Sequence, residues 1–278
     1  MSKSIRERLL PPGWYPSGVK DTTETILAMS RRVPKRDGGA IAGVVPHAGW
    51  EFSGTLALEV MACISRSIDT IVIIGGHLGP SDGILCCMED AFETPLGEMG
   101  ADGELRDWLI ACFNIREDRT PDNSVEVQLP FARYLFPRAR LVGLRAPPSP
   151  EAARLGAEIA AAARRMERKV AVIGSTDLTH YGPNYGFSPA GQGERALSWV
   201  RDVNDRHVVD ALTAMDCSSV LELASRERSM CSAGGALGAM SFALGMGVTK
   251  GQLLRYMTSH EVHPAQSFVG YAGVLYGP

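Results

Sequence analysis

Two apolar runs, each followed by a histidine, constrain this chain more than any other feature. Residues 40–45 lead into Pro46 and His47, and residues 70–74 lead through two glycines to His77. Neither run alternates between apolar and polar residues, which is typical of parallel strands covered on both faces. The segment between them has helical apolar spacing, so the pattern predicts a strand, helix and strand unit. Because such crossovers are right-handed, both histidines should emerge at the same edge of the sheet.

The rest of the chain continues this alternation. Apolar runs at 140–144 and 169–174 predict two more core strands, and the Ala-rich segment 150–166 between them predicts a helix. Further elements are expected as helices over 102–113, 193–215, 218–225 and 236–244, and as two paired strands over 252–259 and 267–276. No linker, composition break or repeat divides the chain. The pattern therefore favours an α/β fold with a mostly parallel or mixed sheet, in one domain spanning 1–278.

Charge and composition narrow the possible functions. The net charge is −3 and the sequence pI is about 6.1, with no basic run of the kind that neutralises nucleic-acid phosphates. The first residues lack the apolar core of a signal peptide, and no apolar run approaches the roughly twenty residues that span a bilayer. We therefore expect a cytoplasmic protein that binds neither nucleic acid nor membrane. The six cysteines should be reduced thiols, and the absence of a CxxC pair argues against a structural zinc site.

Four polar side chains that follow predicted strands are candidates for chemistry. Imidazole is the commonest metal-binding side chain, and His47 with His77 would need only one or two more ligands to hold a first-row metal. Each could instead be a hydrogen-bonded core histidine. Asp177 and His180 follow the strand at 169–174, and a carboxylate there could fix the imidazole tautomer and raise its basicity for proton transfer. The alternative is that Asp177 only caps a turn.

Seven short motifs, in order along almost the whole chain, carry a family resemblance. They are GWYP from Gly13, VPHAGW from Val45, GGHLGP from Gly75, TPLG from Thr94, NSVEVQLPF from Asn123, STDLTHYG from Ser175 and SFVGYAG from Ser267. Together they resemble the Memo family, whose prokaryotic members are called AmmeMemoRadiSam system protein B. The resemblance implies a three-layer αβα domain similar to the subunit of class III extradiol dioxygenases, which are non-heme iron enzymes.

The resemblance also implies a metal site. Extradiol dioxygenases hold Fe(II) with two histidines and a glutamate, and Memo-like proteins keep the histidines but place a cysteine where the glutamate was. Carried onto this chain, the implied ligands are His47, His77 and Cys231, with Asp177 and His180 lining the same pocket. The resemblance therefore implies Fe(II). A thiolate keeps the single charge of a carboxylate but is softer, which makes Cu and Zn the alternatives. Without the resemblance, the sequence would favour Cys231 as a small buried apolar residue, and the resemblance reverses that interpretation.

Three segments depart from this pattern or add to it. Asn123 stands where the family usually has a histidine, and residues 232–236 replace the glycine and later proline that usually follow the cysteine. His260 and His263 have a spacing that differs from the HExxH of zinc proteases. We expect the segment that holds them to be a solvated loop.

The predicted function is that of a metal-dependent oxidoreductase, similar to a dioxygenase, that acts on a small aromatic or phenolic substrate. His180, oriented by Asp177, would serve as acid and base. Two alternatives are a metal-binding redox or peptide-binding adaptor, as animal Memo proteins are described, and a zinc-dependent hydrolase. The resemblance to system protein B further implies a functional link to an AMMECR1-like protein and a radical SAM enzyme.

Overall fold

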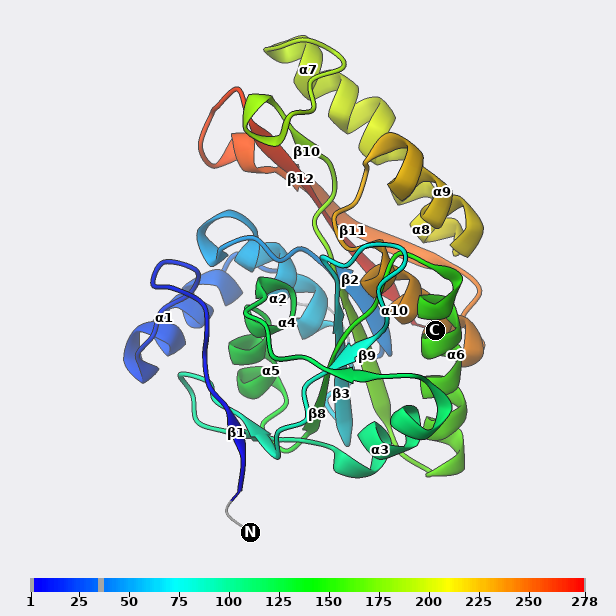
Figure 1. Ribbon diagram of the computed structural model, residues 1–278. Helices are drawn as coiled ribbons and strands as arrows, with labels where there is room; N and C mark the ends of the chain where they lie inside the picture. The colour runs from blue at the N-terminus through cyan, green and yellow to red at the C-terminus, as the bar shows by residue number, and fades with distance from the viewer. Residues whose placement is uncertain (1–2, 35–37, 278) are drawn as a thin grey trace.

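The computed structural model describes residues 3–34 and 38–277 and is organised around one large mixed β-sheet (Figure 1). Within the described residues this sheet has nine strands, in the order β10-β12-β2-β9-β3-β8-β4-β7, with β11 paired to β12. The four central strands run parallel, and they are β2 (Ala42–Val45), β9 (Val170–Ser175), β3 (Thr70–Gly75) and β8 (Arg140–Arg145). The flanking strands are β12 (Phe268–Tyr276), β11 (Gly251–Thr258), β10 (His180–Tyr181), β4 (Leu85–Cys86) and β7 (Arg116–Glu117).

Helices cover both faces of this sheet and complete three layers. Ile71 and Ile73 of β3 enter the core on one face, and Val72 and Ile74 enter it on the other. The first face is covered by α1 (Val19–Ser30), α2 (Thr55–Ala62), α4 (Asn123–Glu126) and α5 (Leu129–Leu135). The second is covered by α3 (Gly103–Cys112), α6 (Pro150–Arg165), α8 (Asp205–Ala214), α9 (Cys217–Glu227) and α10 (Ala233–Gly245). In the described part of the chain, no helix is long and apolar enough to cross a membrane.

The three-layer α/β fold predicted from the sequence is confirmed. All four predicted core strands are present, and the two closing strands pair antiparallel as expected. The helix predicted over 193–215 is instead α7 (Glu194–Trp199), a π-helical segment η3 (Val200–Asn204) and α8. A small sheet of β1 (Ile5–Arg6), β5 (Ala91–Phe92) and β6 (Met99–Gly100) was not predicted, because strands of two residues carry no periodic pattern.

The carboxyl ends of β2, β9 and β3 meet at one edge of the sheet, and α10 begins directly against it. This close approach requires residues without side chains. A Cβ on Gly235 would lie 2.4 Å from the carbonyl oxygen of Ile74, and a Cβ on Gly174 would lie 2.4 Å from that of Gly235. The residues just before α10 are therefore placed beside the strand ends.

Asp205, the first residue of α8, is a buried carboxylate that ties this helix to the segment after β9. Its Oδ1 accepts hydrogen bonds from the Thr179 backbone N–H (3.1 Å) and hydroxyl (2.5 Å), and its Oδ2 accepts one from the Tyr256 hydroxyl (2.7 Å). Burial raises the pKa of Asp205 to about 6, although these hydrogen bonds act in the opposite direction. The folded protein therefore binds a proton here more tightly than the unfolded chain does.

Replacing Asp205 by Asn should remove a pH-dependent loss of stability. The pKa of Asp205 is near 3.9 in the unfolded chain and about 6 in the folded protein. Protonated Asp205 therefore stabilises the fold fully below about pH 3.9, and this contribution is lost as the pH rises through about 6. The free energy of unfolding of the wild type, relative to that of Asp205→Asn, should fall by about 2–3 kcal/mol between roughly pH 4 and pH 8. Urea unfolding followed by circular dichroism measures this difference.

The matched control is Asp210→Asn, because Asp210 lies on the same helix with an exposed side chain. It should show no such pH-dependent difference from the wild type. Parallel pH curves for the wild type and Asp205→Asn would contradict the prediction.

Candidate metal centre

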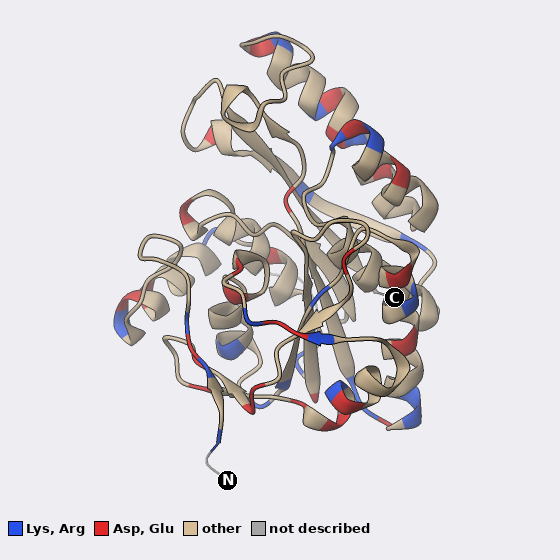
Figure 2. Cartoon of the chain, viewed as in Figure 1, with Lys and Arg blue, Asp and Glu red and all other residues tan. Residues whose placement is uncertain are grey.

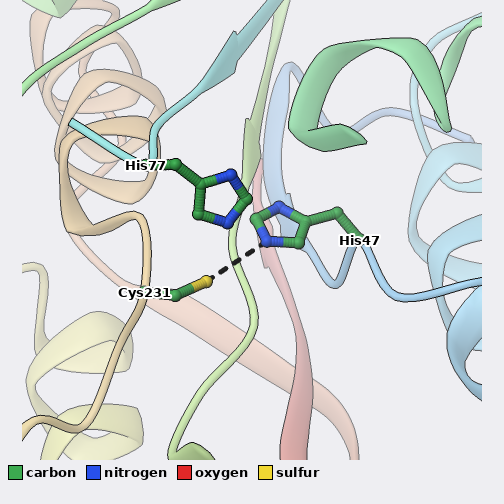
Figure 3. Close-up of side chains that lie close together, drawn as sticks. All are labelled: His47, His77 and Cys231. Carbon is green, nitrogen blue, oxygen red and sulfur yellow. Dashed lines mark hydrogen bonds between the residues drawn. The ribbon is translucent and has the colours of Figure 1, made fainter. Parts of the chain in front are cut away.

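Three side chains from distant parts of the chain converge at the carboxyl edge of the sheet (Figure 3). His47 follows β2, His77 follows β3 and Cys231 precedes α10, and one ligand atom of each lies within 4.8 Å of those of the other two. The Cys231 Sγ is 3.2 Å from His47 Nε2, and the centroids of the two imidazole rings are 4.8 Å apart. The fold therefore brings together the three residues that the sequence marked as candidate ligands.

Each imidazole is held through its Nδ1 atom. His47 Nδ1 lies 3.3 Å from Ser175 Oγ, and His47 Nε2 faces the thiol. His77 Nδ1 lies 2.8 Å from Asp122 Oδ2, and Figure 3 shows the other ring nitrogen directed toward His47 and Cys231. In metal sites such partners fix the tautomer and the ring orientation of the ligand. Two Nε2 atoms and one Sγ form a donor set that fits a divalent transition metal.

The charges of these groups depend on one another. Burial opposes ionisation of Cys231, but the positive charge of His47 and hydrogen bonds from His47 and His77 hold the pKa of the thiol well below its ordinary value. Burial lowers the pKa of His77, but Asp122 and Cys231 outweigh it and raise this pKa to about 10. Burial also opposes ionisation of Asp122, yet His77, Ser124 and Arg145 bring its pKa to about 2. Without metal, these interactions therefore favour a thiolate beside protonated imidazole.

The segment that carries Cys231 is fixed to two strand ends. The Ser232 backbone N–H donates to Thr176 Oγ1 (3.1 Å), and Ser232 Oγ accepts from the His77 backbone N–H (3.2 Å). A Cβ on Gly76 would lie 2.5 Å from the Ser232 Cβ, so only glycine leaves room for this contact. His77 itself has a φ of 59°, a left-handed conformation that a residue other than glycine rarely adopts. Ser232, which departs from the family pattern, thus holds the thiol segment in place.

Asp177 links the candidate metal ligands to His180. Its Oδ1 accepts from the His47 backbone N–H (2.7 Å), and its Oδ2 lies 3.7 Å from His180 Nε2, an ion-pair distance longer than a hydrogen bond. Burial lowers the pKa of His180, but the nearby Asp177 and Cys231 raise it above its ordinary value. The His180 ring stacks on Tyr185, with centroids 4.9 Å apart and planes at 18°. Asp177 therefore contacts both a candidate ligand and the predicted acid/base.

A cavity of about 620 Å³ opens over this cluster. His47, His77, Asp177 and His180 form part of its wall. Aromatic side chains form another part, and they are Trp14, Phe52, Tyr185 and Tyr271. Its size falls within the range of small-ligand pockets.

Residues 9–15, which we call the N-terminal arm, close one side of this cavity. The Glu126 carboxylate accepts hydrogen bonds from the backbone N–H groups of Leu9 (2.8 Å) and Leu10 (3.0 Å) and from the Tyr15 hydroxyl (2.7 Å). The Trp14 carbonyl accepts from the Trp50 backbone N–H (2.8 Å). These bonds fix the arm so that Trp14 lines the cavity.

Some site residues were not identified from the sequence. Asp122 precedes the NSVEVQLPF motif and is also the N-cap of α4, and a capping role alone would explain an Asp there. Asn123 stands where the family usually has a histidine. Its Nδ2 donates to the His47 carbonyl (2.8 Å), and the residue lines the cavity. His263 lies in an exposed segment on the cavity rim, with its Nε2 2.8 Å from Glu51 Oε1.

The three-layer fold and the cluster of two imidazoles and one thiol place this protein in the class of α/β proteins with a candidate metal centre. A family model described as Memo-like protein matches residues 6–275. The MEMO1 family protein of Methanopyrus kandleri is 32% identical over 245 residues, covering 84% of this chain and 82% of that protein. The MEMO1 family protein of Archaeoglobus fulgidus is 32% identical over 280 residues, covering 98% and 99%. The chain belongs to the Memo family.

A solved structure supports the fold alone. The crystal structure of an uncharacterized protein from Escherichia coli K12 superposes with a TM-score of 0.50 and covers 85% of this chain and 99% of that chain. The two sequences are 12% identical. At this identity the likeness extends to the arrangement of helices and strands and not to the chemistry of the site.

Cys231 should ionise at a lower pH than the other thiols. In metal-free protein, ultraviolet thiolate absorbance should reveal one thiolate at neutral pH that is lost in Cys231→Ala. The exposed Cys112 is the internal control: its pKa is raised by partial burial and by Glu158, so Cys112→Ala should keep the signal. His47→Ala should move the titration toward the ordinary thiol value of about 8.5. A wild type without neutral-pH thiolate would contradict this assignment.

Replacing Asp122 by Asn should weaken metal binding. Loss of the carboxylate that holds His77 Nδ1 should lower the affinity for Zn(II), a redox-inert probe, by about 10–100-fold. Competition against a chromogenic chelator measures this affinity, and thermal unfolding checks that the variant is folded. Asp107→Asn, at an exposed acid on α3, is the matched control and should bind Zn(II) as the wild type does. Equal affinities of Asp122→Asn and wild type would exclude a role for Asp122 in the site.

Proposed function

We propose that this Memo family protein is a metal-dependent oxidoreductase, similar to a dioxygenase, in which His47, His77 and Cys231 bind Fe(II). The observation that carries this proposal is the convergence of the three ligand atoms, with His47 and His77 also forming part of the wall of a cavity. Three protein ligands leave coordination positions open, as catalytic sites require and structural sites do not. Bound Fe(II) would supply one-electron and dioxygen chemistry.

The choice of metal follows from the donor set. Cys231 contributes one negative charge, as the carboxylate of a two-histidine, one-carboxylate site would. Its sulfur is softer than oxygen, which keeps copper and zinc as alternatives to iron.

His180 and Asp177 hold a proton beside the ligands. The carboxylate of Asp177 favours the protonated imidazole, so His180 keeps its proton to a higher pH than an ordinary imidazole and can release it when the charge around it changes. Stacking on Tyr185 restrains the ring and excludes water from one of its faces. These two residues are therefore the proposed acid/base and its positioning group.

The cavity wall supports a small aromatic or phenolic substrate. Trp14, Phe52 and Tyr271 present rings to the same space that His180 borders. Among the described residues that line it there is no Lys or Arg, so an anionic substrate would find no fixed cation beyond the histidines and the metal. We also propose the functional link to an AMMECR1-like protein and a radical SAM enzyme, which rests on family membership.

A metal-binding redox or adaptor protein without turnover is the second candidate. The low thiol pKa of Cys231 favours it, because a thiolate beside imidazolium can bind a soft metal or be oxidised without any substrate. A zinc-dependent hydrolase would use the same ligands but would turn over substrate without oxygen.

Metal analysis of protein purified without oxygen is the first test. Wild type should carry near one equivalent of iron. The iron content of Cys231→Ala and of His47→Ala should be lower by a factor of about ten or more, because each variant lacks a direct ligand. Cys112→Ala, which removes an exposed thiol on α3, is the control and should retain the metal. Wild type that stays metal-free even after reconstitution would contradict the proposed site.

Replacing His180 by Gln should separate metal binding from turnover. With a panel of catechols and phenols, oxygen consumption by the metal-loaded variant should fall by about 10²–10⁴-fold while the metal content is unchanged, because the acid/base is lost and the ligands are kept. Tyr185→Phe, which preserves the stacked ring, is the matched control and should stay near wild-type activity. Full activity in His180→Gln would rule out its acid/base role, and a wild type that binds metal but turns over no substrate would favour the second candidate.

A further inference from the structure

We propose that the opposite edge of the sheet holds a second site, which binds a small polyanion carrying two or more phosphate groups. A hollow of about 930 Å³ lies there, and we call it the basic cavity. Five cationic side chains line it: Arg66, Arg138, Arg140, Arg168 and Lys169. Figure 2 shows Lys and Arg segments among Asp and Glu segments along this lower edge.

The basic cavity has a rigid backbone frame. It lies at the amino ends of β3, β8 and β9, where Thr70 is in register with both Arg140 and Val170. Asp69 connects the preceding loops: its N–H donates to the Lys169 carbonyl (2.8 Å), and its carbonyl accepts from the Arg140 N–H (2.9 Å). The sheet therefore holds the backbone positions of these cations near one another, while their side chains become ordered only when a ligand binds.

The two acidic residues of the cavity are already engaged. Asp102 forms an ion pair with Arg168 (2.6 Å) and accepts from the Thr70 hydroxyl (2.5 Å). Asp69 Oδ2 accepts from the Lys169 backbone N–H (2.9 Å). Asp102 therefore neutralises Arg168, and the other four cations outnumber the remaining carboxylate of the cavity, that of Asp69, by three charges.

Among the residues that the structure describes, three of these cations have no partner for their side chains. Across residues 3–34 and 38–277, the side chains of Arg138, Arg140 and Lys169 form no hydrogen bond or ion pair. Arg66 donates to the Leu135 carbonyl (3.0 Å) and lies over the Phe136 ring. Uncompensated positive charge gathered in a hollow attracts anions, even though the whole chain carries a net charge of −3.

The shape and chemistry of the cavity favour a small phosphorylated ligand. Its volume suits a small molecule, and guanidinium groups match phosphate oxygens in geometry and charge. A nucleic acid is disfavoured because the cations do not continue as a basic run, and because Phe136 is buried under Arg66 and offers no free ring for base stacking. Several cations in one hollow call for more than one anionic group, as in a diphosphate or triphosphate.

Calorimetric titration with inorganic tripolyphosphate, at low salt and without added divalent metal, tests the proposal on the full chain. Wild type should bind, and the double variant Arg140→Glu with Lys169→Glu should bind at least about tenfold more weakly because two attractive charges become repulsive. The matched control reverses one Lys and one Arg outside the cavity, Lys20→Glu with Arg195→Glu, both exposed and without side-chain partners among the described residues. It should bind as the wild type does.

Further variants separate this site from folding defects and from the metal centre. Arg138→Ala removes one exposed, unpaired cation and should weaken binding while leaving thermal unfolding unchanged. Cys231→Ala should bind tripolyphosphate normally, whatever its metal content, because its ligand cluster lies at the other edge of the sheet. A nucleoside triphosphate that binds more tightly than tripolyphosphate would support the site and indicate a nucleotide, and equal affinities would support recognition of phosphate alone.

Three results would overturn the proposal. The first is no binding by wild type at millimolar tripolyphosphate. The second is equal weakening of tripolyphosphate binding by the two double variants, which would mean that binding depends on the net charge of the chain and not on the basic cavity. The third is loss of binding in Cys231→Ala, which would assign the anion to the metal centre.

Discussion

The close packing of α10 against the ends of β3 and β9 is the contact on which the candidate metal centre depends. The two histidines are placed by the strands that precede them, but the thiol arrives from far along the chain. It reaches them because Gly235 and Gly174 let the helix start lie against strand backbone, and because Ser232 bonds to the His77 backbone. A side chain at either glycine would meet backbone atoms and would push the helix start, with Cys231 just before it, away from the strand ends.

Opposite charges alternate through the site. Arg145 contacts Asp122 (3.3 Å), Asp122 contacts His77, and the Cys231 sulfur faces both His77 and His47. Each partly desolvated charge thus has a neighbour of the opposite sign, which is how ionised groups are tolerated away from water. Because each group sets the ionisation of the next, the effects of substitutions within this series should not be additive.

The sequence predicts the frame of this protein better than its contacts. Long apolar runs ending in histidine were sufficient to place the strands and to bring two ligands to one edge, because strand direction is fixed by the fold class. The assignment of Cys231 needed the family resemblance, since nothing local distinguishes it from other small buried residues. Asp122 was hidden by its ordinary role as a helix cap, and the basic cavity could not be predicted because only sheet register gathers its scattered cations.

The hydrogen bonds between Glu126 and the N-terminal arm help to enclose the candidate metal centre but do not position its ligands. Enclosure and ligand placement are therefore encoded in different parts of the chain. The ligands belong to the sheet and to α10, whereas Trp14 and the arm supply part of the enclosure. A chain lacking its first fifteen or so residues would keep every candidate ligand, yet its cluster would face bulk water, where electrostatic interactions are weaker and reactive intermediates are poorly protected. Affinity for an ion and control over its reactivity are therefore independently adjustable in this architecture.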